Sequence, residues 1–242
     1  MNTLLSLRGV TKRFGGLVAV NRMDFDVAQH QVLGLIGPNG SGKSTTMNLI
    51  SGAFPVSSGV ITLRGQPITS LAAQDIARRG ISRTFQLVRL LPSMSVLENV
   101  KAGAVFGHRR HWGPDADAIA ETMLEKVGLA GRGHMMVGQL TYIDTKRVEL
   151  ARVLAAEPKV LLLDEWLAGL NPTELEEGIR LIRGLRDEGR TILLVEHVMD
   201  AIRSLCDRCV VMAAGTKIAE GTPAEVLSDP TVIRAYLGDD DA

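Results

Sequence analysis

The chain has 242 residues, of which 45% are apolar and 22% are charged, as in a globular protein with a sizeable buried core. Its 27 lysine and arginine residues balance 27 aspartate and glutamate residues, so the net charge gives no reason to expect nucleic-acid binding. The sequence has neither a run of about 18 apolar residues, which a membrane-spanning helix needs, nor an apolar signal core. We therefore expect a cytosolic protein that reaches a membrane only through partners.

Short apolar runs alternate with helical stretches along the chain, which predicts an α/β fold with a mixed or parallel sheet flanked by helices. Near the N-terminus, one helix is expected to begin near Lys43. Turns are expected at residues 15–16 and 65–67, where Gly and Pro interrupt the pattern. The strands expected in this part of the chain cover residues 4–10, 23–27, 31–36 and 59–63.

The middle of the chain, roughly residues 87–154, is mostly helical in pattern and contains a loop at residues 107–114. After it, buried strands are expected at residues 160–163 and 191–195. Between these strands, apolar residues at helical spacing predict a helix that Gly189 ends. The order predicts an α/β core with a strand-rich part at the front and a helical insertion.

The two cysteines, Cys206 and Cys209, form a single C-x-x-C pair. A zinc site needs about four ligands, and the sequence has no second cluster to supply them. A redox pair would begin a helix, whereas this pair follows a helical stretch and leads into the apolar run 210–212. We expect buried, reduced thiols in a core strand.

Residues 37–44, GPNGSGKS, match the pattern G-x-x-x-x-G-K-[ST], with an apolar strand before them and a helix after them. Glycines in such a loop let backbone N–H groups turn inward around phosphate oxygens, and the helix N-terminus adds its positive dipole end. Lys43 is expected to hold the β- and γ-phosphates of a nucleotide, and the Ser44 hydroxyl to bind Mg²⁺.

The apolar run at residues 160–163 ends in two acids, Asp164 and Glu165. A buried strand that ends in carboxylates carries negative charge to the edge of a sheet. Asp164 is expected to hold Mg²⁺, directly or through water. Glu165 is expected to act as the general base towards an attacking water. The motif is common by itself, and it gains weight from the phosphate loop in the same chain.

Together these motifs resemble the ATP-binding cassette (ABC) ATPases over essentially the whole chain. The resemblance implies one α/β domain at residues 1–242, the ABC-type nucleotide-binding domain. Its RecA-like P-loop core and antiparallel β subdomain would cover about residues 1–86 and 157–242. Its helical subdomain would cover about residues 87–156.

The resemblance also assigns roles to single residues. Phe14 lies where the family stacks an aromatic ring on adenine, and Gln86 resembles the glutamine that contacts Mg²⁺ or the attacking water. His197 resembles the histidine that contacts the γ-phosphate, and residues 168–171 resemble a loop that touches the opposite subunit. The predicted catalytic residues are Glu165, His197, Gln86 and Lys43, and the predicted Mg²⁺ ligands are Ser44, Gln86 and Asp164. The predicted ATP-binding residues are Phe14, Gly37, Pro38, Asn39, Gly40, Ser41, Gly42, Lys43, Ser44 and Thr45, with Thr141 acting in trans.

The family signature, usually Leu-Ser-Gly-Gly-Gln, is degenerate here and reads LTYID at residues 140–144. Thr141 keeps a hydroxyl, but Ile143 adds a branched side chain where a glycine allows close backbone approach to the partner's ATP. Asp144 adds negative charge near phosphate, which Coulomb repulsion disfavours. Either the site that this loop completes is weakened, or the loop packs differently and works. Trp166 replaces the usual Pro after the acids, which we interpret as a packing change.

Several segments are similar to the ATPase subunits of branched-chain amino-acid importers. They are the phosphate loop, residues 83–86, residues 168–172 and the ending at 221–223 and 232–238. The expected function is ATP hydrolysis that drives such import, on the inner face of the cell membrane. The expected partners are a second ABC ATPase, identical or different, two membrane permease subunits and, indirectly, a periplasmic or extracellular substrate-binding protein. The alternatives are another ABC system, such as lipopolysaccharide export, a weakly active regulatory cassette, or a cassette acting on ribosomes or DNA.

Overall fold

The structure is a computed structural model that describes residues 2–237, so Gly238, in the ending compared above, lies outside the described residues. The chain divides into two compact units. The first unit consists of Met1–Ala73 and Ile182–Ala242, and the second of Gln74–Leu181. The subdomain boundaries expected from the sequence stay a prediction.

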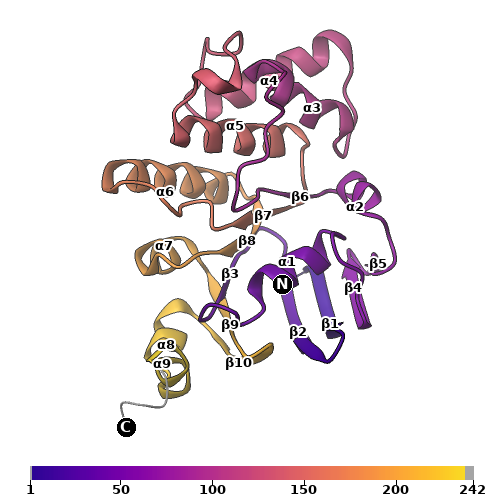
Figure 1. Ribbon diagram of the computed structural model, residues 1–242, viewed down its shortest axis with the longest axis vertical. Coiled ribbons are helices and arrows are strands. Elements are labelled where there is room, and N and C mark those ends of the chain that lie inside the picture. Colours follow the sequence, from indigo (N-terminus) through magenta and orange to yellow (C-terminus); the bar gives the residue numbers. More distant parts are fainter. Residues whose placement is uncertain (1, 238–242) are drawn as a thin grey trace. The chain divides into compact units, whose positions relative to one another are not determined.

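The first unit contains an antiparallel sheet with the strand order β2-β1-β4-β5 (Figure 1). Its strands are β1 (Thr3–Phe14), β2 (Leu17–Ala28), β4 (Ser58–Leu63) and β5 (Gln66–Pro67). The first two strands are longer than the apolar pattern predicts. Both also contain exposed polar residues, such as Arg13 in β1 and Asn21 in β2, which the apolar pattern does not reveal. The turn expected at residues 15–16 joins them.

A second set of strands in this unit has the order β10-β9-β3-β8. The strands are β3 (Val32–Ile36), β8 (Thr191–Val195), β9 (Arg208–Ala213) and β10 (Thr216–Gly221). β3 runs parallel to both β8 and β9, and every residue of β3 and β8 is buried. Continuous apolar runs are typical of parallel strands that are covered on both faces, which is why their sequences show no alternation.

The helices of the first unit are α1 (Lys43–Ile50), α7 (Met199–Leu205), α8 (Pro223–Ser228) and α9 (Pro230–Leu237). Helix α1 begins where the sequence predicts. Helix α6 (Pro172–Asp187) contains residues of both units, and Gly189 follows its end with a φ of 76°. The helix predicted between the two late strands is therefore confirmed.

The second unit contains a parallel pair of strands, β6 (Ile81–Arg83) and β7 (Val160–Asp164), and a set of helices (Figure 1). The helices are α2 (Ala73–Arg79), α3 (Val96–Phe106), α4 (Gly113–Lys126), a 3₁₀ helix at Val137–Gln139 and α5 (Tyr142–Ala155). Helix α4 begins inside the loop expected at residues 107–114, because Pro114 is well suited to a first helical turn.

Among residues 2–237 we find no helix that combines the length and the apolar character needed to cross a membrane. The two cysteines are free and buried, as expected, although only Cys209 lies inside a strand, β9, while Cys206 ends α7. A hydrogen bond with Cys209 and burial raise the pKa of Cys206 far above its usual value. Its thiol therefore stays protonated, which fits a structural role.

Candidate functional site

The predicted site residues are divided between the two units. Phe14, residues 37–45 and His197 belong to the first unit, and Gln86, Thr141, Asp164 and Glu165 belong to the second.

The phosphate loop connects the end of β3 to the start of α1, as the motif requires. The Lys43 side chain is buried, and its Nζ donates to the carbonyl oxygens of Gly37 at 2.8 Å and Pro38 at 2.9 Å. The ammonium therefore lies against the loop. No side chain caps the first turn of α1, and a helix N-terminus is a favourable place for an anion.

Two glycines of this loop are required by the available space. A Cβ on Gly37, whose φ is 149°, would lie 2.0 Å from the carbonyl oxygen of Met212. A Cβ on Gly42, whose φ is 104°, would lie 2.6 Å from the carbonyl oxygen of Ala19. The loop therefore keeps its shape only with glycine at both positions.

The hydroxyl of Ser41 gives an independent indication of a ligand. This side chain is buried, and its Oγ has no hydrogen-bond partner within residues 2–237. A buried polar atom without a partner costs free energy, so such atoms occur where a ligand completes the bonding. The hydroxyl and the N-terminus of α1 are both suited to the oxygens of a phosphate.

Phe14 ends β1 and is 43% exposed, so it does not belong to the core. Its ring packs edge-to-face on Phe54, with 5.4 Å between the ring centroids. The ammonium of Lys12 lies 4.9 Å from the centroid of Phe14. A supported and partly exposed ring is suited to stack on a planar base.

His197 is exposed and lies two residues beyond the end of β8. Strands β3 and β8 are parallel neighbours, with Gly34 opposite Leu194. Carboxyl ends of parallel strands meet at one edge of a sheet, so His197 and the phosphate loop leave this sheet at the same edge. The arrangement agrees with the predicted contact between His197 and a phosphate.

In the second unit, Asp164 ends β7 and is 3% exposed. Its Oδ2 accepts a hydrogen bond of 2.6 Å from Nη2 of Arg83 in a buried ion pair. Its Oδ1 is also buried and has no hydrogen-bond partner among the residues described. One carboxylate oxygen is thus oriented by an arginine while the other fits a metal ion or its water.

Glu165 and Gln86, both predicted to act on the attacking water, are in direct contact. Nε2 of Gln86 donates to Oε2 of Glu165 at 2.6 Å. Glu165 has a left-handed backbone with a φ of 49°, which is unfavourable for a residue with a Cβ. Such conformations persist only where the surroundings hold them, and they cluster at functional sites.

The degenerate signature segment starts helix α5. Thr141 is the N-cap, and its Oγ1 accepts from the backbone N–H of Asp144 at 3.3 Å. The carboxylate of Asp144 is buried and accepts from Nη1 of Arg132 at 2.8 Å and from Nη1 of Arg147 at 3.5 Å. The negative charge that the sequence analysis expected to repel phosphate is therefore compensated within the chain. Ile143 is also buried, so its side chain packs within the chain.

Trp166 is 1% exposed, which confirms that it is a packing residue. Its Nε1 donates to the backbone carbonyl of Lys146 at 3.1 Å. Three charged residues that bond to the predicted site or its flanking backbone do not stand out in the sequence: Arg83, Lys146 and Glu149. The last two lie in the buried part of α5, at a spacing that puts them on one helix face. The sequence signal that could have identified Lys146 and Glu149 is a charged residue within the apolar face of a predicted helix.

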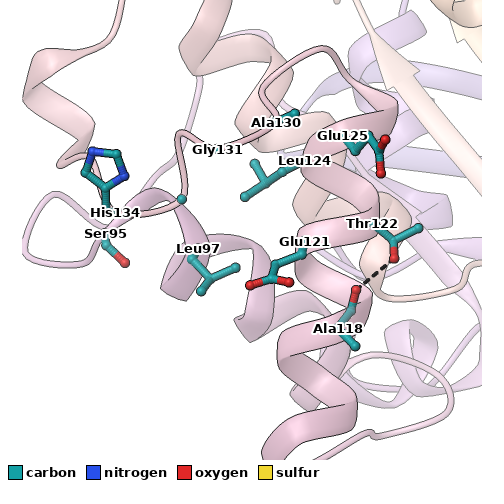
Figure 2. Close-up of a pocket in the computed structure, with 11 residues that line it drawn as sticks. Ser95, Leu97, Ala118, Glu121, Thr122, Leu124, Glu125, Ala130, Gly131 and His134 are labelled. Carbon is teal, nitrogen blue, oxygen red and sulfur yellow. Dashed lines mark hydrogen bonds between the residues drawn. The ribbon is translucent and has the colours of Figure 1, made fainter.

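The second unit contains a hollow of about 780 Å³. Figure 2 shows Leu97 of α3 and Glu121 and Leu124 of α4 in its wall. The Oγ1 of Thr122, also in the wall, donates to the carbonyl of Ala118 at 2.8 Å. None of the predicted site residues lines this hollow.

The loop, the exposed ring and the carboxylates define a P-loop nucleotide-binding protein. A family model described as ABC transporter matches residues 20–168. A second, described as Branched-chain amino acid ATP-binding cassette transporter, matches residues 216–242. The chain belongs to the ATP-binding cassette family of transporter ATPases, and it binds nucleotide. The family and the fold class predicted from the sequence are confirmed.

The relatives include the high-affinity branched-chain amino acid transport ATP-binding protein LivG of Escherichia coli (strain K12), which is 41% identical over 98% of both chains. The corresponding protein BraF of Pseudomonas aeruginosa is 39% identical, also over 98% of both chains. The crystal structure of the ADP conformation of MJ1267, an ATP-binding cassette of an ABC transporter, matches with a TM-score of 0.89 at 30% identity, over 99% of this chain and 100% of that one.

Proposed function

We propose that this chain hydrolyses ATP to drive the import of branched-chain or related amino acids. The observation that carries the ATPase part is the phosphate loop, in which two glycines are required by space and a buried serine hydroxyl lacks a partner. The match of residues 216–242 to the branched-chain family and the similarity to LivG and BraF support this cargo. No observation on this chain favours lipopolysaccharide export.

In the proposed mechanism, Lys43 and the first N–H groups of α1 bind the β- and γ-phosphates of ATP, and Phe14 stacks on adenine. Bound Mg²⁺ would neutralise charge on the transferring phosphoryl group, and Ser44, Asp164 and Gln86 would hold it. Mg²⁺ prefers oxygen ligands such as the hydroxyl of Ser44 and the carboxylate oxygen of Asp164 that has no hydrogen-bond partner among the described residues.

Catalysis in this proposal depends on groups that orient water and accept its proton. Glu165 is the general base towards the attacking water. The hydrogen bond from Gln86 orients the Glu165 carboxylate before that water binds. His197 orients the γ-phosphate. Positioning and electrostatic stabilisation account for most of the rate in phosphoryl transfer, so each of these residues contributes through geometry.

The proposed assembly is a pair of cassettes, each closing over the other's ATP with Thr141 at the start of α5. Two permease subunits in the membrane and a periplasmic or extracellular substrate-binding protein complete the importer, and the chain works on the cytoplasmic side. The presence of Ile143 where the family signature has a glycine is the reason for proposing a different ATPase, with a glycine-containing signature, as the partner. In that pair, the site completed by Ile143 would be the weaker one.

The test is transport by the reconstituted complex. The chain is purified in complex with its permease and second ATPase subunits and placed in proteoliposomes with the binding protein outside. We expect uptake of radiolabelled leucine that requires ATP inside the vesicles and stops with Lys43→Ala. ATP hydrolysis without uptake of any branched-chain amino acid would overturn the proposed cargo and leave the ATPase activity standing.

A further inference from the structure

A fully buried lysine lies on helix α5, close to the general base. Lys146 is 1% exposed, and its Nζ donates to the carbonyl oxygen of Trp166 at 2.9 Å and that of Glu165 at 3.5 Å. The same Nζ lies 5.1 Å from the ring centroid of Tyr142. A buried ammonium is costly unless its three N–H groups find acceptors, and two carbonyls and one aromatic face provide them here.

What this ammonium holds is the turn that contains Glu165. The carbonyl of Glu165 also accepts from the backbone N–H of Ala168 at 3.1 Å, which closes the turn. Trp166 donates its Nε1 back to the carbonyl of Lys146 at 3.1 Å. These bonds join α5 and the turn in both directions. They supply the surroundings that the left-handed backbone of Glu165, with its φ of 49°, requires.

The same face of α5 also holds the segment around Gln86. Glu149 is fully buried, and its carboxylate accepts from the backbone N–H of Phe85 at 3.3 Å and of Arg89 at 3.1 Å. Gln86, between them, donates to Glu165 at 2.6 Å. Helix α5 thus fixes the backbone on both sides of the contact between Gln86 and Glu165. The nearby Glu149 carboxylate also lowers the cost of burying the Lys146 charge.

We propose that Lys146 is a positioning residue for Glu165: its ammonium holds the turn after the general base, so that the Glu165 carboxylate stays aimed at the attacking water. The proposal rests on the catalytic role given to Glu165 above. Lys146 touches neither nucleotide nor water in this account. Its loss should therefore lower kcat and leave ATP binding intact.

The test compares Lys146→Met, which keeps the length of the side chain but removes the charge, with the unmodified chain in the purified transporter complex. We expect kcat to fall by about 10-fold or more, a part of the 10²- to 10⁴-fold that general bases contribute, with the Kd for ATP changed less than about twofold. Lys146→Arg restores part of the rate. The matched control is Lys101→Met, which removes an ammonium paired with Asp117 elsewhere in the unit and leaves kcat unchanged.

A double-mutant cycle separates positioning from general damage. If Lys146 acts through Glu165, adding Lys146→Met to Glu165→Gln leaves the residual rate unchanged, because no base remains to be aimed. An equal loss in both backgrounds, or an unchanged kcat in Lys146→Met alone, would overturn the proposal. Full activity of Glu165→Gln would instead refute the base itself, and with it the proposed catalytic mechanism.

A milder variant keeps the proposal testable if Lys146→Met does not fold. Trp166→Phe removes the Nε1 donor and keeps an aromatic ring, and we expect a smaller fall in kcat with unchanged ATP affinity. The chain has two tryptophans, so Trp166 can be observed alone in a Trp112→Phe background. There, Lys146→Gln should shift the emission of the buried Trp166 to longer wavelength as the turn loosens. An unchanged spectrum together with full activity of Trp166→Phe contradicts the proposal.

Discussion

The phosphate loop and the signature segment are both short stretches that precede a helix, yet they tolerate change very differently. In the loop, residues 37 and 42 have no space for a side chain. The backbone shape that would bind phosphate therefore requires the glycines of the sequence motif. In the signature segment, Thr141 caps α5 and Arg132 and Arg147 compensate Asp144. Here the helix start is stabilised by side chains that the family motif does not specify.

The two segments are therefore expected to respond differently to substitution. A change in the phosphate loop damages local structure and binding together. A change in the signature segment can remove the glycine of the family pattern, which we propose allows close approach to a partner's ATP, and still leave a well-formed helix. The fold at residues 140–144 and the activity of the site that we propose they complete can therefore change independently.

Of the substitutions in these two segments, Gly37→Ala is expected to lower the unfolding free energy most. Its Cβ would lie 2.0 Å from a backbone carbonyl oxygen, so we expect a loss of roughly 3 kcal/mol or more in unfolding free energy. The control is Gly40→Ala, which also has a positive φ but has no atom within 4 Å of the added Cβ. It should cost about 1–2 kcal/mol. Urea denaturation measures both, and equal losses would show that space does not decide the residue at position 37.

A smaller effect is expected from removing the cap of the signature segment. Thr141→Ala leaves the N–H of Asp144 without its acceptor and should cost about 1 kcal/mol in unfolding free energy. Thr141→Ser keeps the hydroxyl and should lie within a few tenths of a kcal/mol of the unmodified chain. Thermal unfolding followed by circular dichroism gives the comparison. If alanine and serine behave alike, Thr141 does not stabilise this helix start.

The smallest effect is a pH dependence from Glu149. Burial raises the pKa of Glu149, against the hydrogen bonds from the backbone of Arg89 and Phe85, above its ordinary value of 4.5. The folded chain thus binds this proton more tightly than the unfolded chain. The resulting stability is fully present below pH 4.5 and is lost as the pH rises through the raised pKa.

Glu149→Gln resembles the protonated side chain and does not titrate. As the pH increases, the unfolding free energy of the unmodified chain should therefore fall relative to that of Glu149→Gln. Urea titrations between about pH 4 and pH 7 measure this difference. A difference that stays constant over that range would contradict the raised pKa.

The phosphate loop, the acidic strand end and the helix that Gly189 ends were predictable because their signals are local: glycine, charge and periodicity within a few neighbouring residues. Lys146 was not, since its acceptors Glu165 and Trp166 lie 19 and 20 residues away in the sequence. The ion pair of Arg83 with Asp164 spans 81 residues, and β6 has only three residues with one fully buried apolar side chain. Contacts of this kind follow from the packing of the fold.

The most direct test of the central claim is ATP binding and hydrolysis by the purified complex carrying Glu165→Gln. We predict that the Kd for ATP changes less than about twofold while kcat falls by about 10²- to 10⁴-fold, because the phosphate-binding groups remain and the base is removed. Turnover at the rate of the unmodified complex, or a loss of ATP binding with the loss of turnover, would contradict this account.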